Sequence, residues 1–154
     1  MGLDSYVTAK RYLWDFGDNN DKAIAEAVGK QFPEIAGYRV KQVEAEVMYW
    51  RKANAIHRWF VDNVQDGVDE CQESYIDSKK LSELRDVCRA VLEDRSQAAE
   101  LLPVQSGFFF GGTEYNEWYF EYVERTLKWL DGLLFKDTFD EKFKNWEFYY
   151  QASW

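Results

Sequence analysis

The segment from Tyr38 to Trp50 alternates between two kinds of side chain, and this alternation limits the fold more than any other feature of the sequence. The polar side chains of Gln42, Glu44 and Glu46 fall on one side of an extended chain. The less polar ones fall on the other side, at Val43, Ala45, Val47 and Tyr49. A period of two residues with one polar face is typical of an antiparallel strand that meets solvent on one side. The chain must therefore supply something to cover the opposite side.

Two more segments have the composition of strands. Residues 3–14 are rich in β-branched and aromatic side chains and end in a turn cluster at 15–21, and residues 145–153 carry rings at alternate positions. Helical spacing of apolar residues predicts helices at about 22–31, 53–65, 78–93 and 114–134, with a further turn at 96–101. Asp77 or Ser78 and then Thr113 are the expected N-caps of the last two helices. We expect a loop from 66 through Tyr75. The pattern predicts an α+β fold in which about four helices pack on one face of a small antiparallel sheet of three or four strands, as one domain over residues 1–154.

The composition and charge of the chain argue against two classes of function, broad nucleic-acid binding and membrane insertion. The chain holds seven Trp, ten Tyr and eleven Phe, and its formal net charge is −9. An acidic chain is unsuited to broad binding of nucleic acid, although a small site for one phosphate needs only two or three local donors. No apolar run reaches the roughly 18–20 residues that a bilayer requires, and no leader pattern opens the sequence, so we expect a cytoplasmic protein without membrane contact. A homodimer is compatible with these features.

Motifs of known catalytic chemistry are missing from the sequence, and we expect a non-enzymatic protein without a cofactor. One histidine and two cysteines, Cys71 and Cys88, do not match a common metal site, and Asp66–Glu70 lacks the ligand spacing of a calcium loop. We therefore predict no metal and no catalytic residues. A hydrolase or transferase that uses His57 as its base is the enzymatic alternative.

One candidate ligand site lies where the second strand enters a helix. Cationic, amide and aromatic side chains cluster there, at Trp50, Arg51, Lys52, Asn54, His57, Arg58 and Trp59. A helix start favours anions, and flat rings stack on a base at about 1–3 kcal/mol per ring, so the cluster has the chemistry of a nucleotide-like site. The alternative is that the rings and His57 belong to the core and the cations neutralise nearby acids.

A second candidate segment surrounds three consecutive phenylalanines. Residues 105–112 read Gln-Ser-Gly-Phe-Phe-Phe-Gly-Gly, and a loop with three large rings must bury them or bind with them. Gln105, Ser106, Phe109 and Phe110 could form the wall of the same pocket. The alternative is a short buried strand.

Several blocks resemble a family of small proteins encoded by bacteriophages and prophages. The blocks are Met1-Gly2-Leu3-Asp4, Tyr49-Trp50-Arg51-Lys52-Ala53-Asn54 with His57, Trp59 and Phe60, residues 63–69, Leu101-Leu102-Pro103, residues 105–111 and Phe148-Tyr149-Tyr150-Gln151. Ser5 departs from the pattern, which has methionine there. The resemblance implies an accessory viral protein that works in the host cytoplasm, and such proteins often inhibit host defence.

Two functions follow as hypotheses. The first is sequestration of a small anionic, nucleotide-like ligand, such as a defence signal, which needs tight binding and no turnover. The second is inhibition of a host protein, for example a defence enzyme, through an acidic surface with Trp and Tyr anchors.

Overall fold

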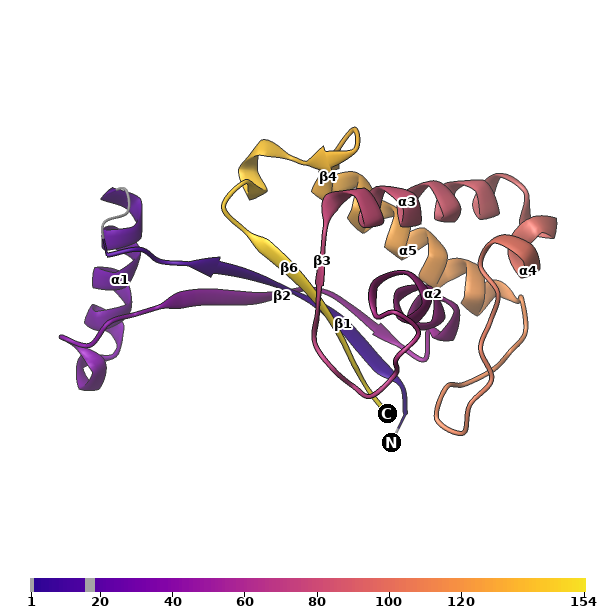
Figure 1. The fold of residues 1–154 in the computed structure, drawn as a ribbon, viewed down its shortest axis with the longest axis horizontal. Coiled ribbons are helices and arrows are strands. Elements are labelled where there is room, and N and C mark those ends of the chain that lie inside the picture. Colours follow the sequence, from indigo (N-terminus) through magenta and orange to yellow (C-terminus); the bar gives the residue numbers. More distant parts are fainter. Residues whose placement is uncertain (1, 16–18) are drawn as a thin grey trace.

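The computed structural model describes residues 2–15 and 19–154, and within them one four-stranded antiparallel sheet organises the fold (Figure 1). Its strand order is β2-β1-β6-β3, with β1 at Asp4–Tyr12, β2 at Gln42–Arg51, β3 at Ser74–Ile76 and β6 at Glu147–Ser153. The N- and C-terminal strands are neighbours, and Asp4 pairs with Ser153. The predicted α+β class and antiparallel sheet are confirmed.

The second strand contains a bulge that changes which side chains face the core. Val7 pairs with Met48 but Thr8 pairs with Glu46, so Val47 is an extra residue opposite β1. A bulge of this kind reverses the alternation beyond it. Trp50 consequently points into the core, whereas Tyr49 is 39% exposed on the other face. The predicted placement of Tyr49 on the same side as Val43 and Ala45 was wrong for this reason.

Four helices form a group at one end of the sheet (Figure 1). They are α2 at Asn54–Val64, α3 at Ser78–Glu93, α4 at Ala98–Leu101 and α5 at Glu117–Leu133. Asp77 caps α3 as predicted, and its side chain accepts a hydrogen bond from the Lys80 N–H at 2.8 Å. The predicted cap Thr113 was wrong, because Asn116 caps α5 by accepting from the Tyr119 N–H at 3.2 Å.

Short elements that the pattern did not predict complete the sheet side of the molecule. The segment expected to be a loop through Tyr75 contains β3, which pairs with β6 over only three residues. After α5, Leu134–Phe135 (β4) and Thr138–Phe139 (β5) form a small hairpin, followed by a 3₁₀ turn at Glu141–Phe143 (η3). Strands of two or three residues are too short to show a periodicity in the sequence.

The interior is strongly aromatic, as the composition indicates. Five of the largest fully buried side chains carry rings, namely Trp50, Phe60, Tyr119, Phe148 and Tyr150. Phe60 and Tyr150 stack with their ring centroids 4.0 Å apart, which joins α2 to the sheet. Cys88, on the apolar stripe of α3, is a buried thiol, and loss of hydration raises its pKa.

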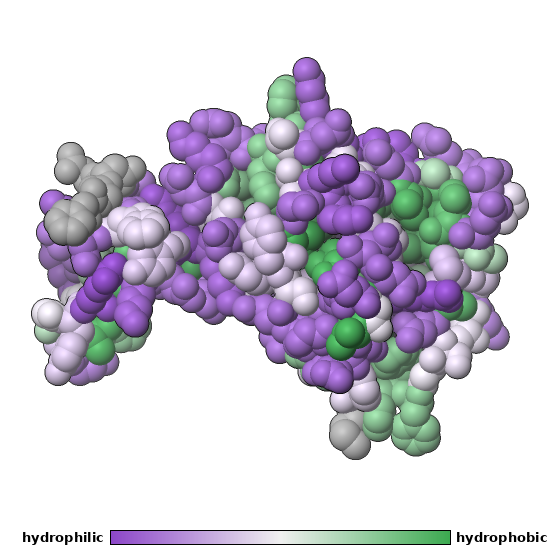
Figure 2. Space-filling model, in the orientation of Figure 1, coloured by the Kyte–Doolittle hydropathy of each residue, from purple (hydrophilic) through white to green (hydrophobic). Residues whose placement is uncertain are grey.

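The remaining helix, α1 at Asn19–Gln31, stands apart from the others (Figure 1). Beyond Lys10 the strands β1 and β2 continue without β6 as a two-stranded ribbon, which leads to α1 and the 3₁₀ turn at Pro33–Ile35 (η1). We call residues 19–41 the arm; Figure 2 shows it as a separate lobe with hydrophilic and hydrophobic side chains mixed on its surface. The predicted turn cluster at 15–21 includes Phe16, Gly17 and Asp18, which lie outside the described residues, as does Met1. None of the described helices is long and apolar enough to cross a bilayer.

Candidate functional site

The two segments expected to form a ligand pocket do meet, and Asn54 joins them. The Asn54 side chain is 1% exposed and lies at the start of α2. Its Nδ2 donates to the carbonyl oxygens of Phe110 at 3.0 Å and Gly112 at 2.8 Å, and its Oδ1 accepts from the Gln105 N–H at 3.1 Å. The Asn54 amide thus bonds to both ends of the 105–112 loop and holds the loop against α2.

Several of the expected site residues belong to the core. Trp50 has no exposed surface, and its indole N–H donates to Thr126 Oγ1 at 2.8 Å. Trp59 is 8% exposed and packs edge-on against Phe60. Phe110 is 7% exposed and its ring meets the His57 ring edge-on, with centroids 5.2 Å apart. Rings packed in this way have little face left on which a base could stack.

His57 lies in a closed hydrogen-bonded chain. Its ring is fully buried, Nδ1 is 2.7 Å from the Tyr150 hydroxyl and Nε2 is 2.9 Å from Asp69 Oδ2. A carboxylate accepts only, so Nε2–H donates to Asp69, and in the neutral tautomer that this bond selects Nδ1 accepts from the hydroxyl of Tyr150. Burial raises the pKa of Tyr150, which keeps that hydroxyl protonated. Both nitrogens are occupied and away from solvent, so this geometry gives no support to His57 as a general base.

The other expected site residues lie on the surface around this junction. Arg51, Lys52 and Ser106 are exposed, and Phe109 is half-buried. Arg51 Nη1 is 3.3 Å from Asp4 Oδ1. The stem of Lys52 lies beside Gly111, since a Cβ at Gly111 would stand 3.0 Å from Lys52 Cβ. Arg51, Lys52 and the backbone of Phe109 all lie close to Gly2, so this surface patch carries two cations.

Arg58 and Gln105 are the last two of the site residues expected from the sequence. Arg58 Nη1 donates to the Val104 carbonyl at 3.2 Å and its Nε lies 3.6 Å from Asp62 Oδ2. With Trp59 and Pro103, Arg58 lines a groove of about 260 Å³ between α2 and the end of α4. Gln105 is half-buried, and its Oε1 is shielded from solvent and has no hydrogen-bond partner among the residues that the structure describes.

Phe108 shows how the triple-phenylalanine loop divides its rings. Phe110 faces the core and Phe109 packs partly against it, whereas the side chain of Phe108 is 95% exposed. The loop contains a turn in which the Phe110 N–H donates to the Gly107 carbonyl at 3.1 Å. The alternative of a short buried strand is therefore wrong, because the segment is an anchored loop with one ring in solvent.

A groove with the expected chemistry lies at the opposite end of β1, beside the point where β6 begins. It has a volume of about 410 Å³. Its lining combines three cations with three aromatic rings, at Lys10, Arg11, Lys144, Tyr12, Trp14 and Trp146. Asp21, Asn145 and Glu147 complete the lining. We call this site the ring-cation groove.

Contacts within the ring-cation groove order several of its side chains. Arg11 Nη2 donates to Asp21 Oδ1 at 2.7 Å, and this bond, with one from the Trp14 N–H, holds the pKa of Asp21 below its usual value. The rings of Tyr12 and Trp14 meet edge-on with centroids 4.6 Å apart. Lys144 is paired with Glu141 at 3.1 Å in a bridge between two well-exposed side chains, which contributes little and exchanges readily with another anion.

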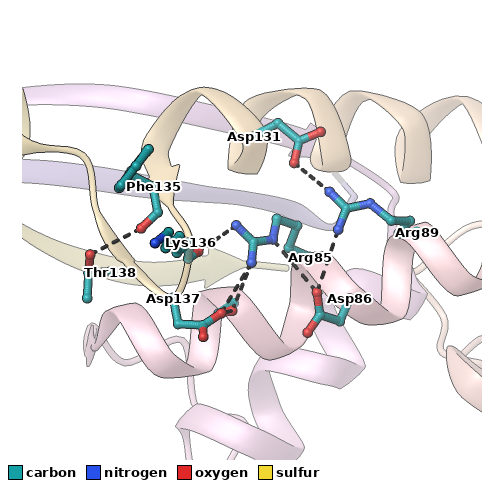
Figure 3. A network of polar contacts seen from close by, with 9 residues as sticks. Arg85, Asp86, Arg89, Asp131, Phe135, Lys136, Asp137 and Thr138 are labelled. Carbon is teal, nitrogen blue, oxygen red and sulfur yellow. Dashed lines mark hydrogen bonds and ion pairs between the residues drawn. The ribbon is translucent and has the colours of Figure 1, made fainter.

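A third charged cluster has a structural role. Arg85 on α3 donates to the Lys136 carbonyl at 2.7 Å and lies 3.4 Å from Asp137, which fastens the β4–β5 hairpin to α3 (Figure 3). One turn along α3, Arg89 pairs with Asp131 of α5 at 3.0 Å. Within the described part of the chain, no group of three or more His, Cys, Asp or Glu side chains is placed to hold a metal ion.

Comparison with known proteins adds no relative: no family model, curated protein or solved structure matches this chain. The arrangement of the side chains therefore carries the functional argument.

The ring-cation groove was not among the sites expected from the sequence, although the sequence contains a signal for half of its lining. Residues 10–14 read Lys-Arg-Tyr-Leu-Trp and so combine cations with rings, as residues 50–59 do. Lys144 and Trp146 supply the other half from 130 or more residues away. Only the pairing of β1 with β6, in which Lys10 faces Glu147, brings these segments together.

Proposed function

We propose that this chain is a non-enzymatic binding protein that sequesters a small anionic ligand with an aromatic ring, such as a nucleotide, in the ring-cation groove. The observation that carries the proposal is the collection of three cations and three rings around one cavity in a chain whose net charge is −9. A volume of about 410 Å³ falls in the range of small-molecule sites, roughly 300–1,000 Å³.

The groove offers each part of such a ligand a matching group. Trp14, at 64% exposed, presents ring surface for stacking, and Trp146 forms a second, partly buried wall. Lys144 is the most accessible of the paired cations, because both members of its ion pair are well exposed. Arg11 is less accessible, since it is bound to Asp21. In this arrangement Lys144 receives the anionic group while the tryptophans hold the ring.

The biological setting follows as part of the same proposal. The resemblance to bacteriophage and prophage proteins suggests an accessory viral protein in the host cytoplasm, where sequestration of a nucleotide-derived signal would counter host defence. Binding without turnover suits this role, because a sequestered signal only has to stay bound.

Calorimetric titration tests the proposal with a panel of AMP, cyclic ADP-ribose isomers, cyclic dinucleotides, adenosine and inorganic phosphate. We expect nucleotides to bind more tightly than adenosine or phosphate alone, and chromatography to recover them intact. Loss of one stacking ring in Trp14→Ala should weaken binding by about 5- to 150-fold, the equivalent of about 1–3 kcal/mol. Lys144→Glu should weaken binding of the nucleotides and leave adenosine unchanged.

Matched controls exist on α5. Trp118 is 54% exposed and Lys128 is exposed, so Trp118→Ala and Lys128→Glu repeat the same changes away from the groove. Lys52→Glu tests the site expected from the sequence. No binding by the folded protein across the panel contradicts the proposal. Loss of binding in Lys52→Glu but not in Lys144→Glu would move the site to the 51–52 patch.

A further inference from the structure

The face of the sheet that points away from the α2–α5 helices has a distinctive composition. Side chains at alternate positions of β1, β2, β6 and β3 share this face by their pairing, for example Tyr6 opposite both Tyr49 and Gln151, and Tyr75 opposite Tyr149. Tyr49 is 39% exposed and Tyr75 is 56% exposed. We call this surface the tyrosine face.

Carboxylates surround the tyrosines. Among the described residues, the carboxylates on the face or its edge include Asp4, Glu44, Glu46, Glu73 and Glu147, and the cations beside them are Lys10, Arg51 and, next to Tyr12, Arg39. Lys10 lies between Glu73 at 2.6 Å and Glu44 at 3.8 Å, with its Nζ 4.5 Å from the Tyr149 ring centroid. The molecule itself thus places a cation over a ring and between acids on this face.

Hydrogen bonds hold the phenol groups in fixed positions. The Tyr149 hydroxyl donates to Glu147 Oε2 at 2.7 Å, and the Tyr49 hydroxyl donates to Asp4 Oδ1. The bond to Glu147 raises the pKa of Tyr149 to about 12, and the bond to Asp4 raises that of Tyr49, so both phenols remain protonated donors. Each pair fixes a ring beside a carboxylate. Lys10 already lies over the Tyr149 ring and Arg51 beside Asp4, so a cation from a partner would compete with these two side chains.

A guanidinium group matches such a pair better than an ammonium group does. Its planar fork can stack on the ring and donate to the carboxylate at the same time, whereas a lysine ammonium is a compact and more strongly hydrated charge. We propose that the tyrosine face is a docking surface for a protein partner that presents arginine side chains. Charge complementarity and the fixed ring-carboxylate pairs single out this occupant. The inference concerns the hypothesis of a host-protein inhibitor and does not depend on ligand binding in the ring-cation groove.

The test compares a decapeptide of arginine with one of lysine, titrated into the folded full-length protein by fluorescence anisotropy. We expect the arginine peptide to bind about 5-fold more tightly at equal salt, because stacking adds to charge attraction. Tyr75→Ala should abolish most of this preference. Glu46→Lys should weaken both peptides, and added salt should weaken them further.

Control variants separate a specific surface from general attraction to an acidic protein. Tyr38, 77% exposed in the arm, and Glu100, exposed on α4, allow Tyr38→Ala and Glu100→Lys as matched changes away from the face. Equal binding of the two peptides, or equal effects of face and control variants, overturns the proposal. Trp14→Ala should leave peptide binding unchanged, so failure here and failure of the ring-cation groove are separate results.

Discussion

Replacing Asn54 with alanine removes the amide that bonds both ends of the 105–112 loop to α2. Three hydrogen bonds are lost, to the carbonyls of Phe110 and Gly112 and from the Gln105 N–H. At about 0.5–1.5 kcal/mol for each bond the sum is about 1.5–4.5 kcal/mol. Gly112 is exposed and its carbonyl can bind water instead, so we expect a loss of about 2–3 kcal/mol in the free energy of unfolding.

Urea denaturation followed by tryptophan fluorescence measures this loss. In a chain of this size the melting temperature should fall by about 5–10 °C, since each kcal/mol corresponds to about 2–4 °C. Hydrogen exchange gives a local readout, because the Gln105 amide loses its acceptor and should exchange faster in the variant.

Asn63→Ala is the matched control. Asn63 is also on α2 but is exposed, and its side chain makes one bond, to the Trp59 carbonyl at 2.8 Å. We expect this variant to stay within about 0.5 kcal/mol of the parent. If Asn54→Ala is equally mild and the Gln105 amide keeps its protection, Asn54 does not anchor the loop and the reasoning fails.

Two further predictions concern packing and pH. Gly107→Ala should lower the free energy of unfolding by about 1–3 kcal/mol in urea denaturation, because its Cβ would stand 2.8 Å from the Phe110 ring. Gly112→Ala should be nearly neutral, because among the described residues none beyond its two chain neighbours has an atom within 4 Å of the new Cβ. Equal losses of stability in Gly107→Ala and Gly112→Ala would show that the loop shifts to accommodate the added methyl group without cost. The hydrogen bond from Arg11 lowers the pKa of Asp21 below 3.8, so its stabilising effect is complete above that pH and is lost as the pH falls through the lowered value. The difference in melting temperature between the parent and Asp21→Asn should therefore shrink on acidification below pH 3.8, and a constant difference would contradict this account.

Much of the fold is predictable because its signals are local. The strands at both ends of the chain, the apolar stripes of α2 and α3 and the cap at Asp77 each depend on residues within a few positions of one another. The convergence of residues 50–59 with the triple-phenylalanine loop also follows the expectation, but the space between them is crossed by the amide of Asn54. An asparagine that binds backbone groups over 50 residues away looks, in the sequence, the same as one that faces a ligand.

Local spacing by itself determined that the chain has a sheet with one solvated face, amphipathic helices to cover the other face and an aromatic core. The tertiary structure decided which aromatic rings stayed exposed on the surface, where a ligand or partner could contact them. The bulge at Val47 turned Tyr49 outward, and the pairing of Lys10 with Glu147 placed Trp146 and Trp14 in the lining of one groove. The physical reason is one of range: periodicity is set by the backbone geometry of neighbouring residues, whereas strand register and side-chain contacts depend on segments that meet only when the whole chain has packed.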